Sequence, residues 1–597
     1  MTKQHKTQTK FTHPTKWNLK LLYNSPTDPQ IEKDLENYNK KRAEFAKKYL
    51  NRTDYLRSEQ LLFSALTEYE QLLNELSGAK PLVYLSYFTT INSNNTQAHA
   101  QLNKITAQLT KSFNQLTFFP IQLGKIDKAL QTKFLSSKQL SRFKYFLERR
   151  FERAKHDLSE EQEKTLNLVD QPGHQMWVEG VEKTLNQLTV SWKGKQLPIS
   201  QASLLIKKLP TKQRRELHNK VLKKISTIKE FAESEINAIV TNKNIQDELR
   251  GYSQPFSSRI LSAQNNPETV KLLIETVTQN FNLAHRFYQL KAKILKLPEL
   301  MYADRNAEIG RIDKQYLFQN SNKILANTFA QLHPDFHQIL TKMVEAGQID
   351  IFPRKNKAGG AFCSSSTNNP TFVLLNHVND LDSVLTFAHE MGHAIHSQLS
   401  KKQPVFYQNY STSIAETAST FFAQFVADKL TKKLSKKEQL IALHDQLEDD
   451  INTIFRQVAL FNFELELHEQ IKEIGFLDYE QIGELLNKHM SSYLGPAVKL
   501  TKLDGRFFIF WPHIRMFFYT YTYAFGHLIS KAMIKNVKDN PAKIKQLHQL
   551  LSAGGNNKPE NILLEAGIDI NQPDFFKKGI DEIKEKLDLL ENNLGKF

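Results

Sequence analysis

The segment 389–393, His-Glu-Met-Gly-His, constrains the fold and chemistry of this chain more than any other feature. Apolar residues recur around it at steps of three and four, which predicts a helix with one buried stripe: Val384, Leu385, Ala388, Met391, Ile395 and Leu399. His389 and His393 share a helix face, so both rings can offer a nitrogen to one metal ion. Glu390 can take a proton from water there. The pattern predicts a hydrolytic metal centre, although two histidines at the edge of a core would show the same spacing.

Zinc in a catalytic site takes three protein ligands, and the sequence offers two candidates for the third. His396 lies seven residues after His389, about 10 Å along the helix axis. Because zinc–nitrogen bonds are about 2 Å long, one ion cannot reach both of these rings, and we interpret His396 as a pocket residue. Glu416 lies in a second predicted helix, which a helix–loop–helix return would bring beside the first. Ser413 and Glu416 also fit a capping box, but the twin histidines favour the ligand.

Further motifs accompany these two helices, in order along nearly the whole chain: residues 250–252, 357–363, 372–376, 386–393, 415–420, 511–513, 518–526, 551–555 and 565–569. With them the sequence resembles the oligoendopeptidase F branch of the M3 zinc metallopeptidases. The resemblance implies a mainly α, two-lobed zincin-type fold with a deep central channel and a small β element beside the active site. The chain departs from the family pattern at Ala423, where an acidic residue is common.

The same resemblance agrees with the site deduced from the residues. His389, His393 and Glu416 are the expected ligands of one zinc ion per chain, and Glu390 is the expected general base. The ligand set also suits cobalt or manganese, so zinc is an expectation from the family.

Donors for the oxyanion are expected from a later segment that contains a histidine and alternating tyrosines. His513 and Tyr519 are our first candidates, and Tyr523 is the next. Tyr521 stays open, because alternating Tyr and Thr residues also fit plain aromatic packing.

Stretches rich in Leu, Lys, Glu and Gln at helical spacing predict that most of the chain is helical, among them residues 29–49, 58–76, 98–116, 138–153 and 211–249. Strand-like runs are few: residues 188–192, 350–353 and 372–376. We expect residues 372–376 to form an edge against which an extended peptide lies, with a small structural hairpin as the alternative. A turn near residues 194–198 predicts an N-terminal helical region, 1–198, and a catalytic metallopeptidase domain, 199–597.

Charge and cysteine content narrow the partners and the compartment. Lys and Arg exceed Asp and Glu by 80 − 63 = 17, but the lysines are spread over helical faces without a compact basic motif. A solvated surface therefore explains the surplus better than nucleic-acid binding. Residues 1–20 lack an apolar core, no window of about twenty apolar residues occurs, and Cys363 is the single cysteine. These features predict a cytoplasmic protein that spans no membrane.

The H-E-x-x-H site predicts a metallopeptidase, and the family resemblance implies a zinc endopeptidase whose channel admits short oligopeptides and excludes folded proteins. A dipeptidyl carboxypeptidase on a related scaffold is the alternative within enzymes, and it would need a cationic clamp that the sequence does not identify. An inactive peptide-binding protein is the alternative outside enzymes, which the intact H-E-x-x-H argues against. The oligomeric state is left open.

Overall fold

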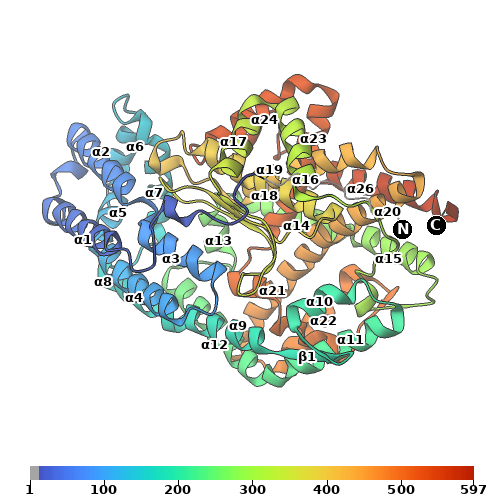
Figure 1. The fold of residues 1–597 in the computed structure, drawn as a ribbon. Helices are drawn as coiled ribbons and strands as arrows, with labels where there is room; N and C mark the ends of the chain where they lie inside the picture. Colours follow the sequence, from blue (N-terminus) through green and yellow to red (C-terminus); the bar gives the residue numbers. More distant parts are fainter. Residues whose placement is uncertain (1–11, 597) are drawn as a thin grey trace.

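The structure is a computed structural model that describes residues 12–596. It is mainly α-helical, with a few short strands, which confirms the predicted class (Figure 1). Within this part of the chain, none of the helices has the length and apolar character that crossing a bilayer requires. Most of the polar N-terminal segment, on which the expected localisation depended, lies outside the described residues.

The N-terminal helices gather on one side of the molecule, at the left of Figure 1. They share one hydrophobic core, which includes Tyr55, Leu66, Phe119 and Leu147. The helices of this part are α1 (Gln30–Tyr49), α2 (Glu59–Leu76), α3 (Lys80–Ile91), α4 (Thr96–Phe113), α5 (Phe118–Gly124), α6 (Lys128–Ser136) and α7 (Lys144–Arg153). The next two helices are α8 (Glu160–Asp170) and α9 (Met176–Gln187), and α9 contributes Val181 and Leu185 to a second core.

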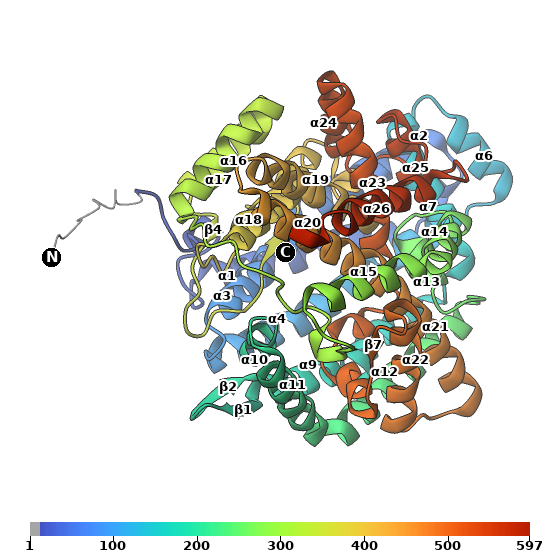
Figure 2. The same cartoon turned by 90° about the vertical axis from the view of Figure 1, so that its right-hand side faces the viewer.

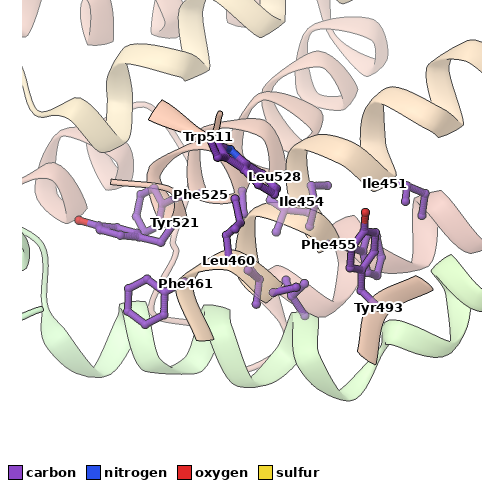
Figure 3. Close-up of a cluster of buried hydrophobic side chains, with 14 of the residues drawn as sticks. Ile451, Ile454, Phe455, Leu460, Phe461, Tyr493, Trp511, Tyr521, Phe525 and Leu528 are labelled. Carbon is purple, nitrogen blue, oxygen red and sulfur yellow. The ribbon is translucent and has the colours of Figure 1, made fainter. Parts of the chain in front are cut away.

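A second, larger core extends from Val181 to Leu590. Figure 3 shows part of it, where Tyr521, Phe525 and Leu528 pack among aromatic and aliphatic side chains. Its helices are α10 (Ile199–Ile206), α11 (Thr211–Ile225), α12 (Lys229–Leu249), α13 (Ser257–Ser262), α14 (Pro267–Gln279), α15 (Phe281–Ile294), α16 (Phe318–Leu332), α17 (Pro334–Glu345), α18 (Leu381–Ser400), α19 (Thr412–Thr431), α20 (Lys436–Asp450), α21 (Arg456–Ile474), α22 (Tyr479–Leu494), α23 (Tyr521–Asp539), α24 (Ile544–Ala553), α25 (Pro559–Glu565) and α26 (Phe575–Glu591). The predicted boundary at residue 198 stays a prediction.

Two of the predicted helices differ in the structure: one is divided into two helices, and the other begins later than expected. Residues 211–249 form α11 and α12, because a 3-10 turn, Ser226–Ile228, separates them. The hydroxyls of Ser226 and Thr227 donate to the carbonyls of Leu222 and Lys224, which ends α11. In residues 138–153 the α-helix starts only at Lys144, after another 3-10 turn.

Three small sheets complete the fold. An antiparallel hairpin of β1 (Thr189–Trp192) and β2 (Lys195–Pro198) lies beside α10 and α11 (Figure 2). The parallel pair β3 (Leu300–Met301) and β7 (Val498–Lys499) joins distant segments. The third sheet has the order β4-β6-β5, from Ile349–Asp350, Phe372–Leu374 and Phe362–Ser364.

The third sheet corrects two strand predictions. Residues 372–376 were expected to form an edge, but β6 is the central strand and β5 is an edge. The expected strand at 350–353 is only the pair Ile349–Asp350. Strand β6 lies between both cores: Phe372 and Leu374 belong to the N-terminal core and Val373 to the larger one. The backbone groups of a strand that is buried on both faces need hydrogen-bond partners along both edges. The short strands β4 and β5 supply these partners.

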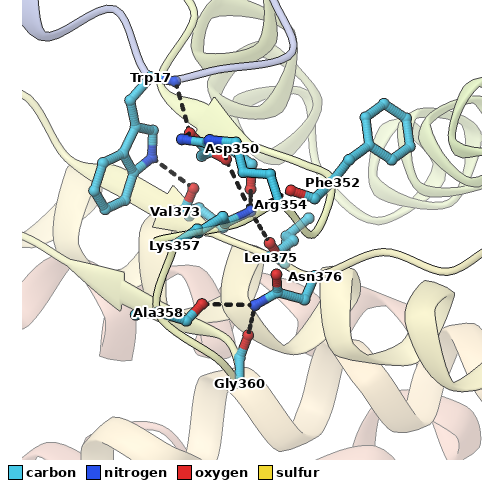
Figure 4. A network of polar contacts seen from close by, with 10 residues as sticks. All are labelled: Trp17, Asp350, Phe352, Arg354, Lys357, Ala358, Gly360, Val373, Leu375 and Asn376. Atoms are coloured by element: carbon cyan, nitrogen blue, oxygen red, sulfur yellow. Dashed lines mark hydrogen bonds and ion pairs between the residues drawn. The ribbon is translucent and has the colours of Figure 1, made fainter. Parts of the chain in front are cut away.

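A polar network holds the loop that leads into β5 (Figure 4). Asp350 accepts hydrogen bonds from Arg354 and from the backbone N–H of Trp17, and pairs with Lys357 at 2.8 Å. Lys357 also donates to the carbonyl of Leu375. The amide of Asn376 donates to the carbonyls of residues 358 and 360, at 3.0 and 2.7 Å. These contacts fix the chain immediately before the edge strand.

Candidate metal centre

Helix α18 carries the H-E-x-x-H segment and begins as its sequence predicts. Asp380 is the N-cap residue, and its carboxylate accepts a hydrogen bond from the backbone N–H of Ser383 at 2.9 Å. Of the predicted apolar stripe, Leu385 is partly exposed and the other residues are buried. The stripe anchors the helix in the larger core, which leaves His389 and His393 on a neighbouring face.

Close packing of three helices positions the candidate ligands. A Cβ atom on Gly392 of α18 would lie 2.5 Å from the Cα of Ser419 in α19. A Cβ on Gly526 of α23 would lie 2.7 Å from the Cβ of Glu416. Both glycines therefore allow backbones to approach where any side chain would clash. Gly392 thus lies at the contact between α18 and α19.

The start of α19 excludes the capping interpretation of Glu416. The N-cap residue is Ser411, whose hydroxyl accepts from the backbone N–H of Ser413. The helix begins at Thr412, so Glu416 is not three residues after the cap. Its carboxylate is free to point toward α18.

The three candidate ligands converge. Oε2 of Glu416 lies 3.5 Å from Nε2 of His389 and 3.8 Å from Nε2 of His393. Ligand atoms around a tetrahedral ion with bonds of about 2.0 to 2.2 Å are about 3.3 to 3.6 Å apart. Two imidazoles and one carboxylate are also a donor set that zinc and related ions prefer. The residues therefore fit a metal ion.

The electrostatics of both histidines suit metal binding. Burial lowers the pKa of His389 to about 4, with a further contribution from His393, although a third of the His389 side chain is accessible. Burial also lowers the pKa of His393, whose ring makes a hydrogen bond with the backbone of Ala415. Neutral imidazoles at neutral pH offer a free nitrogen lone pair to a cation.

Glu390 lies in a different environment from the ligands. It is 6% exposed, and burial together with the charge of Glu416 raises its pKa to about 8. The backbone N–H of Cys363, in the edge strand β5, hydrogen-bonds the carboxylate and opposes this rise. A cation bound beside Glu390 would lower the pKa further, toward the range of a general base at neutral pH.

His396 lies apart from the ligand cluster. Its ring is fully buried and stacks on Tyr410, with 3.5 Å between ring centroids and an interplanar angle of 8°. Burial lowers the pKa of His396 to about 3. The structure places it in an aromatic stack, and it is not among the residues that converge at the candidate metal centre.

The candidate oxyanion donors form a connected group near Glu416. Trp511 donates its indole N–H to Nδ1 of His513 at 3.0 Å, so the neutral ring carries its proton on Nε2. That nitrogen is 3.2 Å from the hydroxyl of Tyr523. The rings of Tyr519 and Tyr523 are 5.3 Å apart, and the charge of Glu416 contributes to the raised pKa of both.

Tyr521 differs from its neighbours. It is buried in the larger core, and its hydroxyl donates to Oδ1 of Asn265 at 2.9 Å (Figure 3). Tyr519 and Tyr523, by contrast, are only partly buried. The structure thus separates a packing tyrosine from two that lie beside the ligands, which the alternating sequence pattern left open.

The backbone before Tyr519 is strained, and the two residues that stabilise this backbone belong to none of the sequence motifs. Phe517 and Phe518 both have positive φ angles, 43° and 54°. The guanidinium of Arg259 donates to the carbonyl of Phe517 at 3.0 Å, and the carboxyl of Glu464 accepts from the N–H of Phe518. Glu464 is fully buried, which raises its pKa to about 8. An acidic residue directly after the largely apolar run Leu-Phe-Asn-Phe was a signal that the sequence offered.

A second group of potential metal ligands lies elsewhere, at His333, Asp335 and His548. Nδ1 of His333 accepts from the backbone N–H of Asp335, and the Asp335 carboxylate pairs with His548 at 2.9 Å and Lys402 at 3.6 Å. The two histidine rings are stacked, 4.2 Å apart. His333 is the N-cap residue of α17, and the Asp335 carboxylate joins it to His548, so these contacts describe the group as a cap for α17 that contacts α24.

A helical fold in which an H-E-x-x-H helix packs against a helix that supplies a glutamate defines a metallopeptidase. Residues 204–582 match the family model described as peptidase family M3, and residues 122–189 match the one described as oligopeptidase F. The chain therefore belongs to peptidase family M3.

Relatives with known names agree with this assignment. The chain is 24% identical to an oligoendopeptidase F homolog of Lactococcus lactis subsp. lactis (strain IL1403), over 99% of both chains. It is 26% identical to group B oligopeptidase PepB of Streptococcus agalactiae serotype III (strain NEM316), over 83% of this chain and 84% of that protein. The crystal structure of oligoendopeptidase-F from Enterococcus faecium has the same fold, with a TM-score of 0.72 at 17% identity, covering 95% of this chain and 99% of that one. The resemblance to oligoendopeptidase F is confirmed.

Proposed function

We propose that this protein is a zinc-dependent endopeptidase that hydrolyses internal bonds of short peptides. The observation that carries the proposal is the convergence of His389, His393 and Glu416 beside the buried carboxyl of Glu390. The family of the chain and the names of its relatives support the peptidase class.

In this proposal His389, His393 and Glu416 hold one zinc ion, which, when bound, acidifies water and polarises the carbonyl of the substrate. Glu390 takes the proton from the attacking water and passes it to the leaving amine. The N–H of Cys363 keeps the Glu390 carboxylate oriented between these two events.

His513, Tyr519 and Tyr523 are the proposed donors to the oxyanion that develops on the scissile carbonyl. The Trp511 N–H fixes the His513 tautomer with its proton on Nε2, the atom that faces Tyr523. A neutral imidazole can therefore donate without being charged, and burial lowers its pKa to about 4.

The edge strand β5 is the proposed platform for the substrate. One edge of β5 pairs with β6, and the N–H of Cys363, in the middle of β5, hydrogen-bonds the Glu390 carboxylate. A peptide added beside β5 would run past the catalytic carboxyl with backbone hydrogen bonds that tolerate many side chains. We expect substrates of about 7 to 20 residues in an enclosed site, and the cytoplasm as the compartment.

The test combines zinc analysis with mass spectrometry of digested peptides. Wild-type protein should bind one zinc per chain and cut within peptides. Glu390→Gln should keep the zinc and lose about 1000-fold or more of the turnover, whereas the exposed control Glu345→Gln should match wild type. Retained turnover in Glu390→Gln would remove that residue as the base. Release of C-terminal dipeptides alone would indicate the exopeptidase, and zinc binding without any cleavage would indicate a peptide-binding protein.

A further inference from the structure

Lys401, at the C-terminal end of α18, is a partly buried cation with no acidic partner. Its ammonium donates to the carbonyl of Asn369 at 2.6 Å and to the hydroxyl of Thr371 at 3.0 Å, and both of these residues are buried. No carboxylate of residues 12–596 forms an ion pair with it, whereas its neighbour Lys402 pairs with Asp335. Burial lowers the pKa of Lys401 to about 8. A buried cation of this kind would gain from an anionic ligand.

A polar cavity of about 190 Å³ lies beside Lys401. Hydroxyl groups of Ser365, Ser366 and Thr367 are among those that line it, so the wall can donate hydrogen bonds to a ligand. The volume suits one acidic side chain or one chain end. The composition of the wall favours an anionic over an apolar ligand.

This cavity lies at the C-terminal end of the edge strand β5. Ser365 follows β5 directly, and its hydroxyl lies 2.9 Å from the Thr371 hydroxyl that also binds Lys401. At about 3.3 Å per residue, Ser365 lies about 7 Å beyond Cys363 along the strand direction, and the chain turns directly after it, at Thr367 and Asn368. A peptide on β5 with its scissile bond beside Glu390 would therefore place a group two to four residues away at the cavity.

Tyr410 links the cavity to the metal centre. It lines the cavity, its hydroxyl is 3.0 Å from that of Ser397, and its ring stacks on His396. Burial raises the pKa of Tyr410, and the charges of Glu416 and Tyr519 add to this rise. The cavity and the ligand cluster thus lie within electrostatic range of each other.

A lysine at a helix C-terminus also stabilises the helix dipole. Here, however, the ammonium donates to residues 369 and 371 of a different segment. The dipole therefore explains the sign of the charge at this position, but it does not explain a cavity lined with hydroxyls beside it.

We propose that the cavity beside Lys401 binds a carboxylate of the peptide substrate, two to four residues from the scissile bond. The carboxylate comes either from an Asp or Glu side chain or from the C-terminus of the peptide. The proposal rests on the proposed function, because it assigns a subsite to the same peptide-cleaving centre.

The test compares matched peptides on zinc-loaded enzyme. In the first set of pairs, the two peptides carry Asp or Asn at one position, two, three or four residues from the scissile bond. In the second set, the two peptides end in a free carboxylate or in an amide. Wild type should cleave the carboxylate member with the higher kcat/KM. Lys401→Met should lower that value about ten-fold and leave the neutral member unchanged. Lys401→Arg should keep the preference, and Lys402→Met should behave as wild type.

The pair that responds identifies the source of the carboxylate. Equal losses for acidic and neutral peptides in Lys401→Met, or no preference in wild type, would overturn the proposal. Binding of fluorescent peptides to the Glu390→Gln variant gives a readout that needs no turnover. If wild type cleaves no peptide, the proposed function fails, while a carboxylate preference that Lys401→Met abolishes in this binding assay still supports the subsite.

Discussion

The ligand helices and the tyrosine segment meet at one site, but different interactions hold them. Helices α18 and α19 are regular, and Gly392 lets their backbones touch. The segment that ends at Tyr519 is irregular, with left-handed backbone at Phe517 and Phe518. Arg259 and Glu464, more than fifty residues distant in sequence, hold that backbone through hydrogen bonds.

The difference suggests a division of tasks. Metal ligands must keep positions within a few tenths of an ångström, which packed helices provide. Donors to a developing oxyanion must be preorganised but must also admit a substrate, and a strained loop fixed by polar contacts can do both. Substitutions in the two regions should therefore fail in different ways, in metal content for the first and in rate for the second.

The largest effect is expected from Glu416→Ala, which removes one of three ligands. Zinc content should fall to near zero, and turnover should fall about 1000-fold or more. His396→Ala is the matched control, because that ring stacks on Tyr410 and lies outside the ligand cluster. It should keep stoichiometric zinc. Zinc loss in His396→Ala together with zinc retention in Glu416→Ala would reverse the assignment of the third ligand.

Tyr519→Phe tests the second region. Removal of one oxyanion donor should lower kcat about 10- to 100-fold with little change in KM and none in zinc content. Tyr521→Phe is the control, since its hydroxyl binds Asn265 inside the core. The control should lose about 1 kcal/mol of stability and keep its rate. A larger rate loss in Tyr521→Phe would mean that the donors are wrongly assigned.

Gly392→Ala tests whether helix contact holds the ligands. The added methyl would lie 2.5 Å from the Cα of Ser419, so α18 and α19 must separate. We expect a loss of about 1 to 3 kcal/mol in denaturant unfolding, with weaker zinc binding. Gly483→Ala, in α22, would meet its nearest neighbour, the carbonyl carbon of Gly505, only at 3.4 Å and should be close to neutral. Equal stability of the two variants would contradict tight packing at the metal centre.

The smallest effect on turnover is expected from Glu464→Gln, and its effect on stability depends on pH. Burial raises the pKa of Glu464 to about 8, so the folded protein retains a proton that the unfolded chain loses above about pH 4.5. This group should therefore lower the free energy of unfolding as pH rises from about 5 to 8, by up to about 1.4 kcal/mol per pH unit. Glu464→Gln should flatten that slope and slow turnover only a few-fold. An unchanged slope between the variant and wild type would show that Glu464 does not titrate in this window.

Most of the candidate metal centre could be predicted from the sequence, because the residues that define it are close together along the chain. Spacing placed His389 and His393 on one face of a single predicted helix. The alternatives for Glu416 could not be decided locally, since the choice depended on which serine caps α19.

Long-range pairing limited the remaining predictions. The runs at β4 and β5 are two and three residues long, so their sequences could not indicate that β6 is central. The polar contacts of Glu464 and Lys401 likewise join segments distant in sequence. Neither residue belongs to a motif, and only the fold reveals its surroundings.

Anomalous diffraction from a zinc-loaded crystal tests the central claim most directly. We predict one strong peak about 2.0 to 2.2 Å from Nε2 of His389, Nε2 of His393 and a carboxylate oxygen of Glu416. A peak at His333, Asp335 and His548 with none between α18 and α19 would contradict the account.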